Sequence, residues 1–232
     1  LWCLPDTLDC PKCACIPPKS VLLNMSEYTQ DGPEAQKIAS VIPYYPFHGV
    51  PRFYDISGMT HNPEVFQSCI DIFVNRYKAL EVDAIAGLDA RGFVLGPPIA
   101  LALKKPFIMI RKKGKLPNAV TGANYFKEYE GGNAQGGDEL CISRNALKPG
   151  QRILVIDDLV ATGGTLTAAC DLIAAVGGVI VECACIVELK MLQGYAKLNA
   201  KHPDVKVWAL ISEDILQLEG KEGEPKAPCE SK

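Results

Sequence analysis

The sequence predicts an α/β fold: a Rossmann-like, open, mainly parallel twisted sheet with helices on both faces. Three observations predict it. The chain has 232 residues, enough for one such domain with its own core, and 48% of them are hydrophobic. Short apolar runs that are typical of buried strands alternate with longer runs of helical periodicity. An acidic, glycine-rich turn follows one of the expected strands, at the point where sheets of this class bind ligands.

The expected strands are short apolar runs bounded by turn residues. They cover residues 84–88, 106–111, 152–156, 179–187 and 205–210. Helices are expected between them, at residues 34–41, 63–80, 92–103, 164–176 and 189–198. The helical signal is strongest where Phe66, Ile70 and Phe73 recur at helical spacing after Pro63. A repeated strand–helix–strand order predicts parallel strands that are covered on both faces.

The chain is expected to divide into a core and three further segments. Residues 1–24 are rich in Pro and Cys and are interpreted as a leader outside the fold. Residues 25–60 form a small N-terminal segment, and residues 61–217 form the core. A mobile lid is expected at about 112–137, because that stretch is long, polar and rich in glycine. The charged residues 218–232 are predicted to be a disordered tail.

Composition argues against several classes of partner. The formal net charge of −3 lacks the basic excess of nucleic-acid binders. No apolar run reaches the roughly 18 residues that span a membrane. The single CxxC at Cys10 and Cys13 is a weak zinc signal, since no second pair follows. Most later cysteines lie in apolar stretches, so we expect free thiols, a reducing compartment and a cytoplasmic location.

The run ILVIDDLVATGGT, residues 153–165, carries the strongest chemical signal. Its first four residues predict a strand, which leads into two carboxylates, Asp157 and Asp158. The following loop opens a helix, whose free backbone N–H groups favour a bound phosphate, and Gly163 and Gly164 allow close approach. A ribose phosphate fits both parts, because its phosphate binds the loop and its hydroxyls donate to the carboxylates. The alternative is a plain strand-to-helix turn.

This run resembles the phosphoribosyl pyrophosphate (PRPP) signature of the type I phosphoribosyltransferases. The resemblance implies that Asp157 and Asp158 contact the ribose hydroxyls. It also implies that the 5′-phosphate is held by Ala161, Thr162, Gly163, Gly164 and Thr165. The signature does not identify the base, and it also occurs in PRPP synthetases and in regulators without the chemistry. Three other segments are similar to the adenine phosphoribosyltransferases and narrow the choice.

The first segment is AGLDARGF, residues 86–93, between a strand end and a helix start, which is an anion site. By resemblance, Asp89, Ala90 and Arg91 bind pyrophosphate, often through a strained peptide between Ala90 and Arg91. The alternative is a surface arginine.

The second segment begins with the basic run at 111–115, and its pyrophosphate ligands are expected to be Arg111, Lys112 and Lys115. On charge alone, that run would be a solvated face.

The second segment continues into the lid. The family resemblance places Tyr125 and Tyr129 in the lid, and it makes Glu128 the catalytic residue that exchanges a proton with purine N7 as N9 attacks C1′. Glu130 is the nearby alternative. The third segment, residues 42–57, resembles the family's base-binding hood, with Phe53 stacking on adenine and with Arg52 and Tyr54 reading its edge. The alternative is a packing loop of prolines and aromatics.

Together these features predict an enzyme of purine salvage, a glycosyltransferase that converts adenine and PRPP to AMP and pyrophosphate. Mg²⁺ is the expected cofactor, with no direct protein ligand unless Asp157 or Asp158 reaches it through water. The family resemblance implies a homodimer. A 6-oxopurine phosphoribosyltransferase and a non-catalytic regulator that binds PRPP or purine remain as alternatives. The paired aspartates and Gly164, in place of a lysine, argue against the first, and Glu128 argues against the second.

Overall fold

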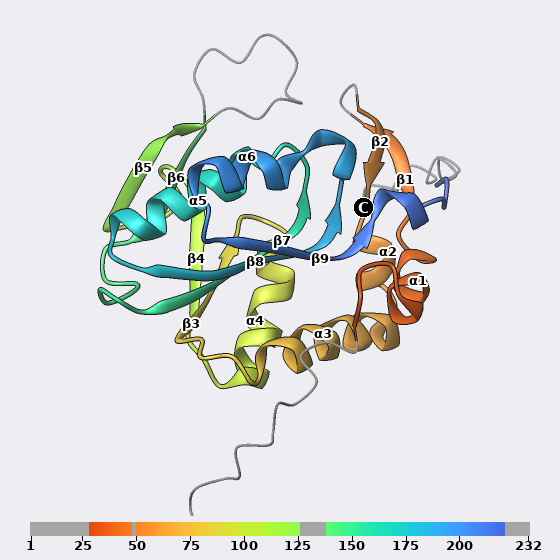
Figure 1. Ribbon diagram of the computed structural model, residues 1–232, viewed down its shortest axis with the longest axis horizontal. Coiled ribbons are helices and arrows are strands. Elements are labelled where there is room, and N and C mark those ends of the chain that lie inside the picture. The colour runs from red at the N-terminus through yellow and green to blue at the C-terminus, as the bar shows by residue number, and fades with distance from the viewer. Residues whose placement is uncertain (1–27, 48–49, 126–137, 221–232) are drawn as a thin grey trace, which may run out of the picture.

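The computed structural model describes residues 28–47, 50–125 and 138–220, which fold around one seven-stranded sheet (Figure 1). The strand order is β5-β6-β4-β3-β7-β8-β9. Five neighbouring strands from β4 to β9 run parallel, while β6 and β5 add an antiparallel edge. The predicted open, mainly parallel sheet is therefore confirmed. The strands are β3 Ala84–Leu88, β4 Phe107–Lys112, β5 Ala119–Tyr125, β6 Asp138–Ser143, β7 Arg152–Val160, β8 Val179–Glu188 and β9 Lys206–Ser212.

Helices cover both faces of the sheet (Figure 1). On one face lie α3 Pro63–Tyr77 and α4 Gly92–Leu103, and on the other lie α5 Gly164–Ala175 and α6 Gly194–Lys201. A hydrophobic core lies on each face of the sheet, and alternate residues of the central strand β7 pack into each. Leu154 and Ile156 pack on the α3/α4 side, and Ile153 and Val155 pack on the α5 side. This alternation is why the central strand is apolar on both faces.

A second, two-stranded sheet lies at one end of the molecule. The antiparallel strands β1 Tyr44–Phe47 and β2 Val50–Tyr54 form it, beside the short helices α1 Pro33–Ala39 and α2 Ser57–Thr60 (Figure 1). Strand β1 also pairs with the end of the described chain: Tyr44 N donates to Leu218 O, and Gly220 N donates to Tyr44 O, both at 2.9 Å. Residues 218–220 thus belong to the fold, contrary to the disordered tail that was predicted from residue 218.

Several element boundaries differ from the prediction. Helix α3 ends at Tyr77, three residues before the expected end. Strand β7 continues to Val160 because Leu159 and Val160 pair with β8, so Asp157 and Asp158 are strand residues. The expected helix at 189–198 is a 3-10 turn, η1 Lys190–Leu192, and then α6 Gly194–Lys201, separated at Gln193 with φ of 52°.

Strands β5 and β6 were not predicted. The first, Ala119–Tyr125, occupies part of the segment that was assigned to the lid at 112–137. Its antiparallel pairing with β6 at the sheet edge explains why a polar, glycine-containing sequence forms a strand here. The rest of the expected lid and the expected leader, residues 1–24, lie outside the described residues.

Candidate active site

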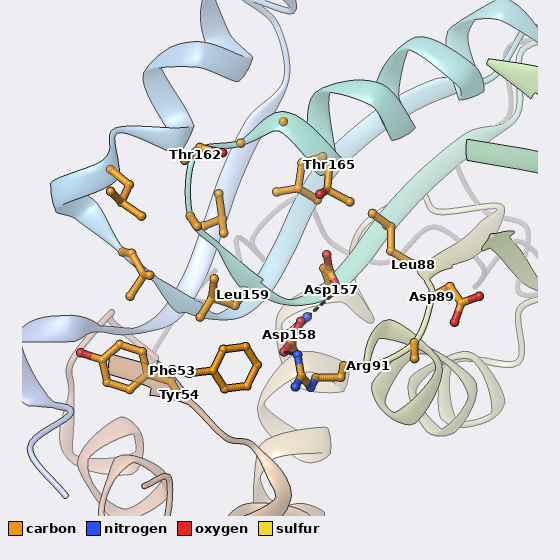
Figure 2. Close-up of a pocket in the computed structure, with 18 of the residues that line it drawn as sticks. Phe53, Tyr54, Leu88, Asp89, Arg91, Asp157, Asp158, Leu159, Thr162 and Thr165 are labelled. Atoms are coloured by element: carbon orange, nitrogen blue, oxygen red, sulfur yellow. Dashed lines mark hydrogen bonds and ion pairs between the residues drawn. The ribbon is translucent and has the colours of Figure 1, made fainter. Parts of the chain in front are cut away.

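A pocket lies at the carboxyl ends of the central strands. From β3 the chain passes through α4 to β4 on one side, and it later returns to β7 on the other side of β3. The connections that follow the paired strands β3 and β7 therefore run in opposite directions, which creates a topological switch point, the usual binding crevice of an open α/β sheet. Residues after β3, at the end of β7 and before α5 line this pocket together with strand β2 (Figure 2).

Most of the predicted site residues meet there, although they come from four separate segments of the sequence. The pocket is lined by Arg52, Phe53, Tyr54, Asp89, Ala90, Arg91, Lys112, Asp157, Asp158, Ala161, Thr162, Gly163, Gly164 and Thr165. Arg111 and Lys115 are not among its described lining residues. Arg111 instead donates from Nε to Asp89 Oδ2 at 2.9 Å and from Nη1 to Lys115 O at 3.2 Å, so it orients Asp89 from behind.

The loop before α5 is built from backbone in close contact with backbone. Gly163 is left-handed, with φ of 77°, and directly precedes a helix that has no side-chain cap, which leaves the first N–H groups available to an anion. A Cβ on Gly163 would lie 2.3 Å from Gly194 O, and one on Gly194 would lie 2.3 Å from Ala161 O. The start of α6 therefore supports this loop from behind, which sequence reasoning did not detect.

The surroundings of the two aspartates disfavour the ionised form of both carboxyl groups. Asp158 N donates to Asp157 Oδ1 at 3.0 Å, and Asp158 Oδ2 lies 3.5 Å from Arg91 Nη1. Burial raises the pKa of Asp157 well above its ordinary value, and the charge of Asp158 adds to this. Burial also raises the pKa of Asp158, against the opposing effect of Arg91. Ligand hydroxyls that donate to these carboxylates would relieve the cost.

The loop after β3 brings Arg91 to the centre of the pocket. The peptide bond between Asp89 and Ala90 is cis, one residue before the position expected for a strained peptide. Gly92 opens α4 so close to β7 that a Cβ would lie 2.6 Å from Ile156 O. The Arg91 guanidinium lies 4.9 Å from the centre of the Phe53 ring, and Figure 2 shows it beside Asp158 on the side of Phe53.

The opposite part of the pocket is apolar and aromatic. Phe53 and Tyr54 come from β2 and lie beside Leu159 of β7 (Figure 2), and Leu189 and Leu192 around η1 also line the pocket. These three leucines were not predicted as site residues. Leu159 could have been found from its place directly after the acid pair, whereas Leu189 and Leu192 carried no local signal. The chemical contrast between the two parts suits a ligand with a phosphorylated end and a flat apolar end.

Three expected site residues belong to the lid segment. Glu128 and Tyr129 lie outside the described residues, and Tyr125 is described only by its backbone in β5. Within the described residues no cluster of three or more His, Cys, Asp or Glu side chains could hold a metal ion. The same residues include no helix with the length and apolar character to cross a membrane.

Comparison with known proteins identifies the family. Residues 55–217 match the phosphoribosyl transferase domain. Adenine phosphoribosyltransferase 1 of Triticum aestivum is 43% identical over 182 residues, which cover 77% of this chain and 94% of the relative. The chain belongs to the adenine phosphoribosyltransferase family. The predicted membership, and with it the classification as a transferase, is confirmed.

Solved structures of family members agree with the fold. The adenine phosphoribosyl transferase of Trypanosoma brucei, in complex with AMP, pyrophosphate and ribose-5-phosphate, has a TM-score of 0.79 at 32% identity and covers 88% of this chain and 90% of its own. The Saccharomyces cerevisiae enzyme, complexed with an imino-altritol bisphosphate and adenine, has a TM-score of 0.66 at 34% identity, covering 76% of this chain and 98% of its own. The family fold is therefore shared over the whole core.

Proposed function

We propose that this protein is a purine-salvage enzyme that converts adenine and PRPP to AMP and pyrophosphate. One observation carries the proposal: the glycine loop, the acid pair and Arg91 converge on one pocket, which is also lined by the aromatic ring of Phe53. A phosphate, a ribose, a diphosphate and a flat base each find a suitable partner there. The names of the relatives and the ligands of the T. brucei structure support the same reaction.

The binding roles follow from the chemistry of each segment. The N–H groups and hydroxyls from Ala161 to Thr165 bind the 5′-phosphate. Asp157 and Asp158 accept hydrogen bonds from the ribose hydroxyls, which stabilises their ionised forms. Arg91 and Lys112 pair with the diphosphate, and Arg111 keeps Asp89 in position beside them. Phe53 stacks on the base, and Arg52 and Tyr54 read its edge.

The reaction exchanges one bond at C1′ of the ribose. The C1′–O bond breaks, its electron pair leaves with the pyrophosphate, and the lone pair of adenine N9 forms the new bond to C1′. Positive charge on the ribose is stabilised by the two carboxylates beside it. The purine then loses a proton from N7, and Glu128 is our candidate acceptor.

Mg²⁺ is proposed as the cofactor, and the described residues fit a metal that is held mainly by substrate. The pocket offers Asp157 and Asp158 but no cage of three ligating side chains among the residues described, which suits a cation that keeps its waters and binds phosphate oxygens. The two aspartates would contact it through water. When bound, Mg²⁺ neutralises charge on the departing diphosphate.

The test is a comparison of three bases. The protein is incubated with PRPP, Mg²⁺ and adenine, hypoxanthine or guanine, and the nucleotide products are separated by chromatography. We expect AMP to form fastest. IMP or GMP formation at an equal or higher rate would identify a 6-oxopurine enzyme instead. Binding of PRPP without turnover of any base would identify a regulator. Glu128→Ala is expected to lower turnover strongly with little change in PRPP affinity.

We also propose a homodimer, because helix α4 and strand β4 expose large apolar side chains. Val94 and Leu101 are 39% and 80% exposed, and Met109 is 45% exposed. Apolar groups gathered on one surface commonly mark an interface. Light scattering of the protein and of Leu101→Glu tests this, with a monomer expected only for the variant.

A cytoplasmic location is proposed as well, since the described cysteines are free thiols.

A further inference from the structure

The apolar part of the pocket depends on a very short element. The 3-10 turn η1, Lys190–Leu192, has only three residues, yet the leucines at and before it, Leu189 and Leu192, line the pocket. A turn of this length has little stability of its own, because few hydrogen bonds compensate for the ordering of its backbone. Its position must therefore be fixed by contacts with other parts of the chain.

Glu213 supplies those contacts. Its Oε2 accepts a hydrogen bond from Lys190 N and its Oε1 accepts one from Met191 N, each at 2.9 Å. These are the first N–H groups of η1, which lack a partner inside the turn. One carboxylate thus binds both of these N–H groups. Because the acceptor is charged, the two hydrogen bonds are stronger than bonds between neutral groups.

The segment that carries Glu213 is itself tightly held. It begins the 3-10 turn η2 Glu213–Ile215, in which Ser212 Oγ accepts from Asp214 N at 3.3 Å. Asp31 accepts from Ser212 N and from Ser212 Oγ, each at 2.7 Å. Lys190 Nζ lies 3.6 Å from Asp31 Oδ2 and 3.7 Å from Asp214 Oδ2. The N-terminal and C-terminal parts of the described chain therefore converge on η1.

Glu213 also lies near the base-facing side of the pocket. Burial raises the pKa of Tyr54, and the negative charge of Glu213 adds to that effect, so the carboxylate is close enough to the phenol to influence it. Tyr54 and Leu192 both line the pocket. Glu213 therefore sits behind this apolar part, without lining the pocket itself.

We propose that Glu213 is a positioning residue for the purine: by accepting hydrogen bonds from Lys190 N and Met191 N, it holds Leu189 and Leu192 in the pocket that they line together with Phe53. This inference rests on the proposed function. Gly194, which lies two residues after the end of η1, supports the phosphate loop, but its helix α6 is also fixed by packing on α5 and by the buried Leu198. Loss of Glu213 should therefore weaken adenine recognition much more than PRPP recognition.

The test is Glu213→Gln, measured by initial rates with each substrate varied in turn. Glutamine keeps the size but offers one carbonyl oxygen, and its NH₂ group then faces a backbone N–H. We expect the KM for adenine to rise about threefold to fivefold, the net effect of losing one hydrogen bond at an exposed site where water can replace the acceptor. The KM for PRPP and kcat at saturation should change less than about twofold. The matched control is Asp214→Asn, which weakens a long, exposed ion pair with Lys190 and keeps an oxygen that can accept from Ser212 Oγ, so both KM values should change less than about twofold.

A second variant tests the same idea without touching Glu213. Leu192→Ala shortens the wall that Glu213 positions, and it should also raise the KM for adenine selectively. The inference is overturned if Glu213→Gln leaves the KM for adenine unchanged, or if both KM values rise together, as they would for a general loss of structure. Should the glutamine variant fail to fold, an unchanged KM for adenine in Leu192→Ala would overturn it. Absence of AMP formation by the unsubstituted protein would instead overturn the proposed function, and this inference with it.

Discussion

The two parts of the pocket are built in different ways. The phosphate-binding part is one continuous run, from Asp157 to Thr165, at the end of a central strand and the start of a helix. The base-binding part combines β2, the end of β7 and the turn η1, which are far apart in the sequence. The first part relies on backbone geometry, and the second relies on side chains that meet through long-range packing.

This difference has consequences for rigidity. The glycine loop is fixed by backbone contacts that leave no room for a single methyl group, as the approach of Gly163 to Gly194 shows. On the base side, Leu192 is 44% exposed and depends on the hydrogen bonds of Glu213. We therefore expect substitutions on the phosphate side to cause large losses of activity. Substitutions on the base side should cause smaller, graded changes in the KM for adenine.

The largest effect is expected for Gly163→Ala. The new Cβ would lie 2.3 Å from Gly194 O, and the residue must also keep a left-handed φ of 77°. We expect kcat/KM for PRPP to fall by about a hundredfold or more, because overpacked backbone must move at the point where the phosphate binds. Steady-state kinetics at saturating adenine measure this.

Gly150→Ala provides the control for backbone strain. Gly150 has a similar φ of 83°, but no atom lies within 4 Å of its added Cβ, and it is not a lining residue of the pocket. We expect a loss of stability of about 1–2 kcal/mol and normal kinetics. Equal kinetic losses in both variants would contradict the view that close backbone packing governs the phosphate side.

A smaller but still large effect is expected for Asp157→Asn, which should separate binding from stability. PRPP affinity should fall by more than about tenfold, because an amide is a weaker acceptor for ribose hydroxyls than a carboxylate. The melting temperature without ligand should rise by about 2–4 °C at neutral pH, since the variant no longer buries this charge. Isothermal titration calorimetry and thermal denaturation measure the two effects.

The pH dependence follows from the direction of the shift. The pKa of Asp157 is raised in the folded protein, so the carboxyl is protonated at low pH in both states and destabilises nothing there. As pH rises from its ordinary pKa through the raised value, the unfolded state ionises first and stability is lost. The advantage of Asp157→Asn should thus be absent below the ordinary pKa of an aspartate and grow as pH rises above it. Asp158→Asn should gain less, because it leaves Arg91 without its ion-pair partner. An advantage of Asp157→Asn that is constant with pH would contradict this account.

The same contrast explains what could be predicted from the sequence. Asp157, Asp158 and the loop to Thr165 were predictable because their order alone places carboxylates and free N–H groups at one strand end. The continuation of β7 through Leu159 was not, because it depends on pairing with Val187 of a later strand.

The base side shows the limit more clearly. Leu189 and Leu192 have the periodicity of a helix, and only the left-handed Gln193 breaks it into a turn that faces the pocket. Glu213 lies in a stretch with no motif, and its role depends on long-range hydrogen bonds. Sequence patterns report local geometry and periodicity, whereas the positions of Leu189 and Leu192 in the pocket are determined by contacts between distant segments.

Phe53→Ala is expected to have a graded effect on the base side. Loss of the aromatic surface should raise the KM for adenine about tenfold, the usual value of a stacked ring. The KM for PRPP should stay the same or fall slightly, because the Arg91 guanidinium lies 4.9 Å from the ring centre and becomes freer to pair with diphosphate. A matched rise in the KM for PRPP would show that the two parts are not separable.

The smallest effect is expected for Phe47→Ala, one layer behind the base. The Phe47 ring lies 5.0 Å from that of Phe53 at an interplanar angle of 53°, and it is 51% exposed. Such a contact contributes about 0.5–1.5 kcal/mol when buried, so a half-exposed one should change the KM for adenine only about twofold to fourfold. Initial rates at saturating PRPP measure it. A change as large as that of Phe53→Ala would mean that the orientation of Phe53 is as tightly determined as the glycine loop, and the contrast between a backbone-built and a side-chain-built half would then fail.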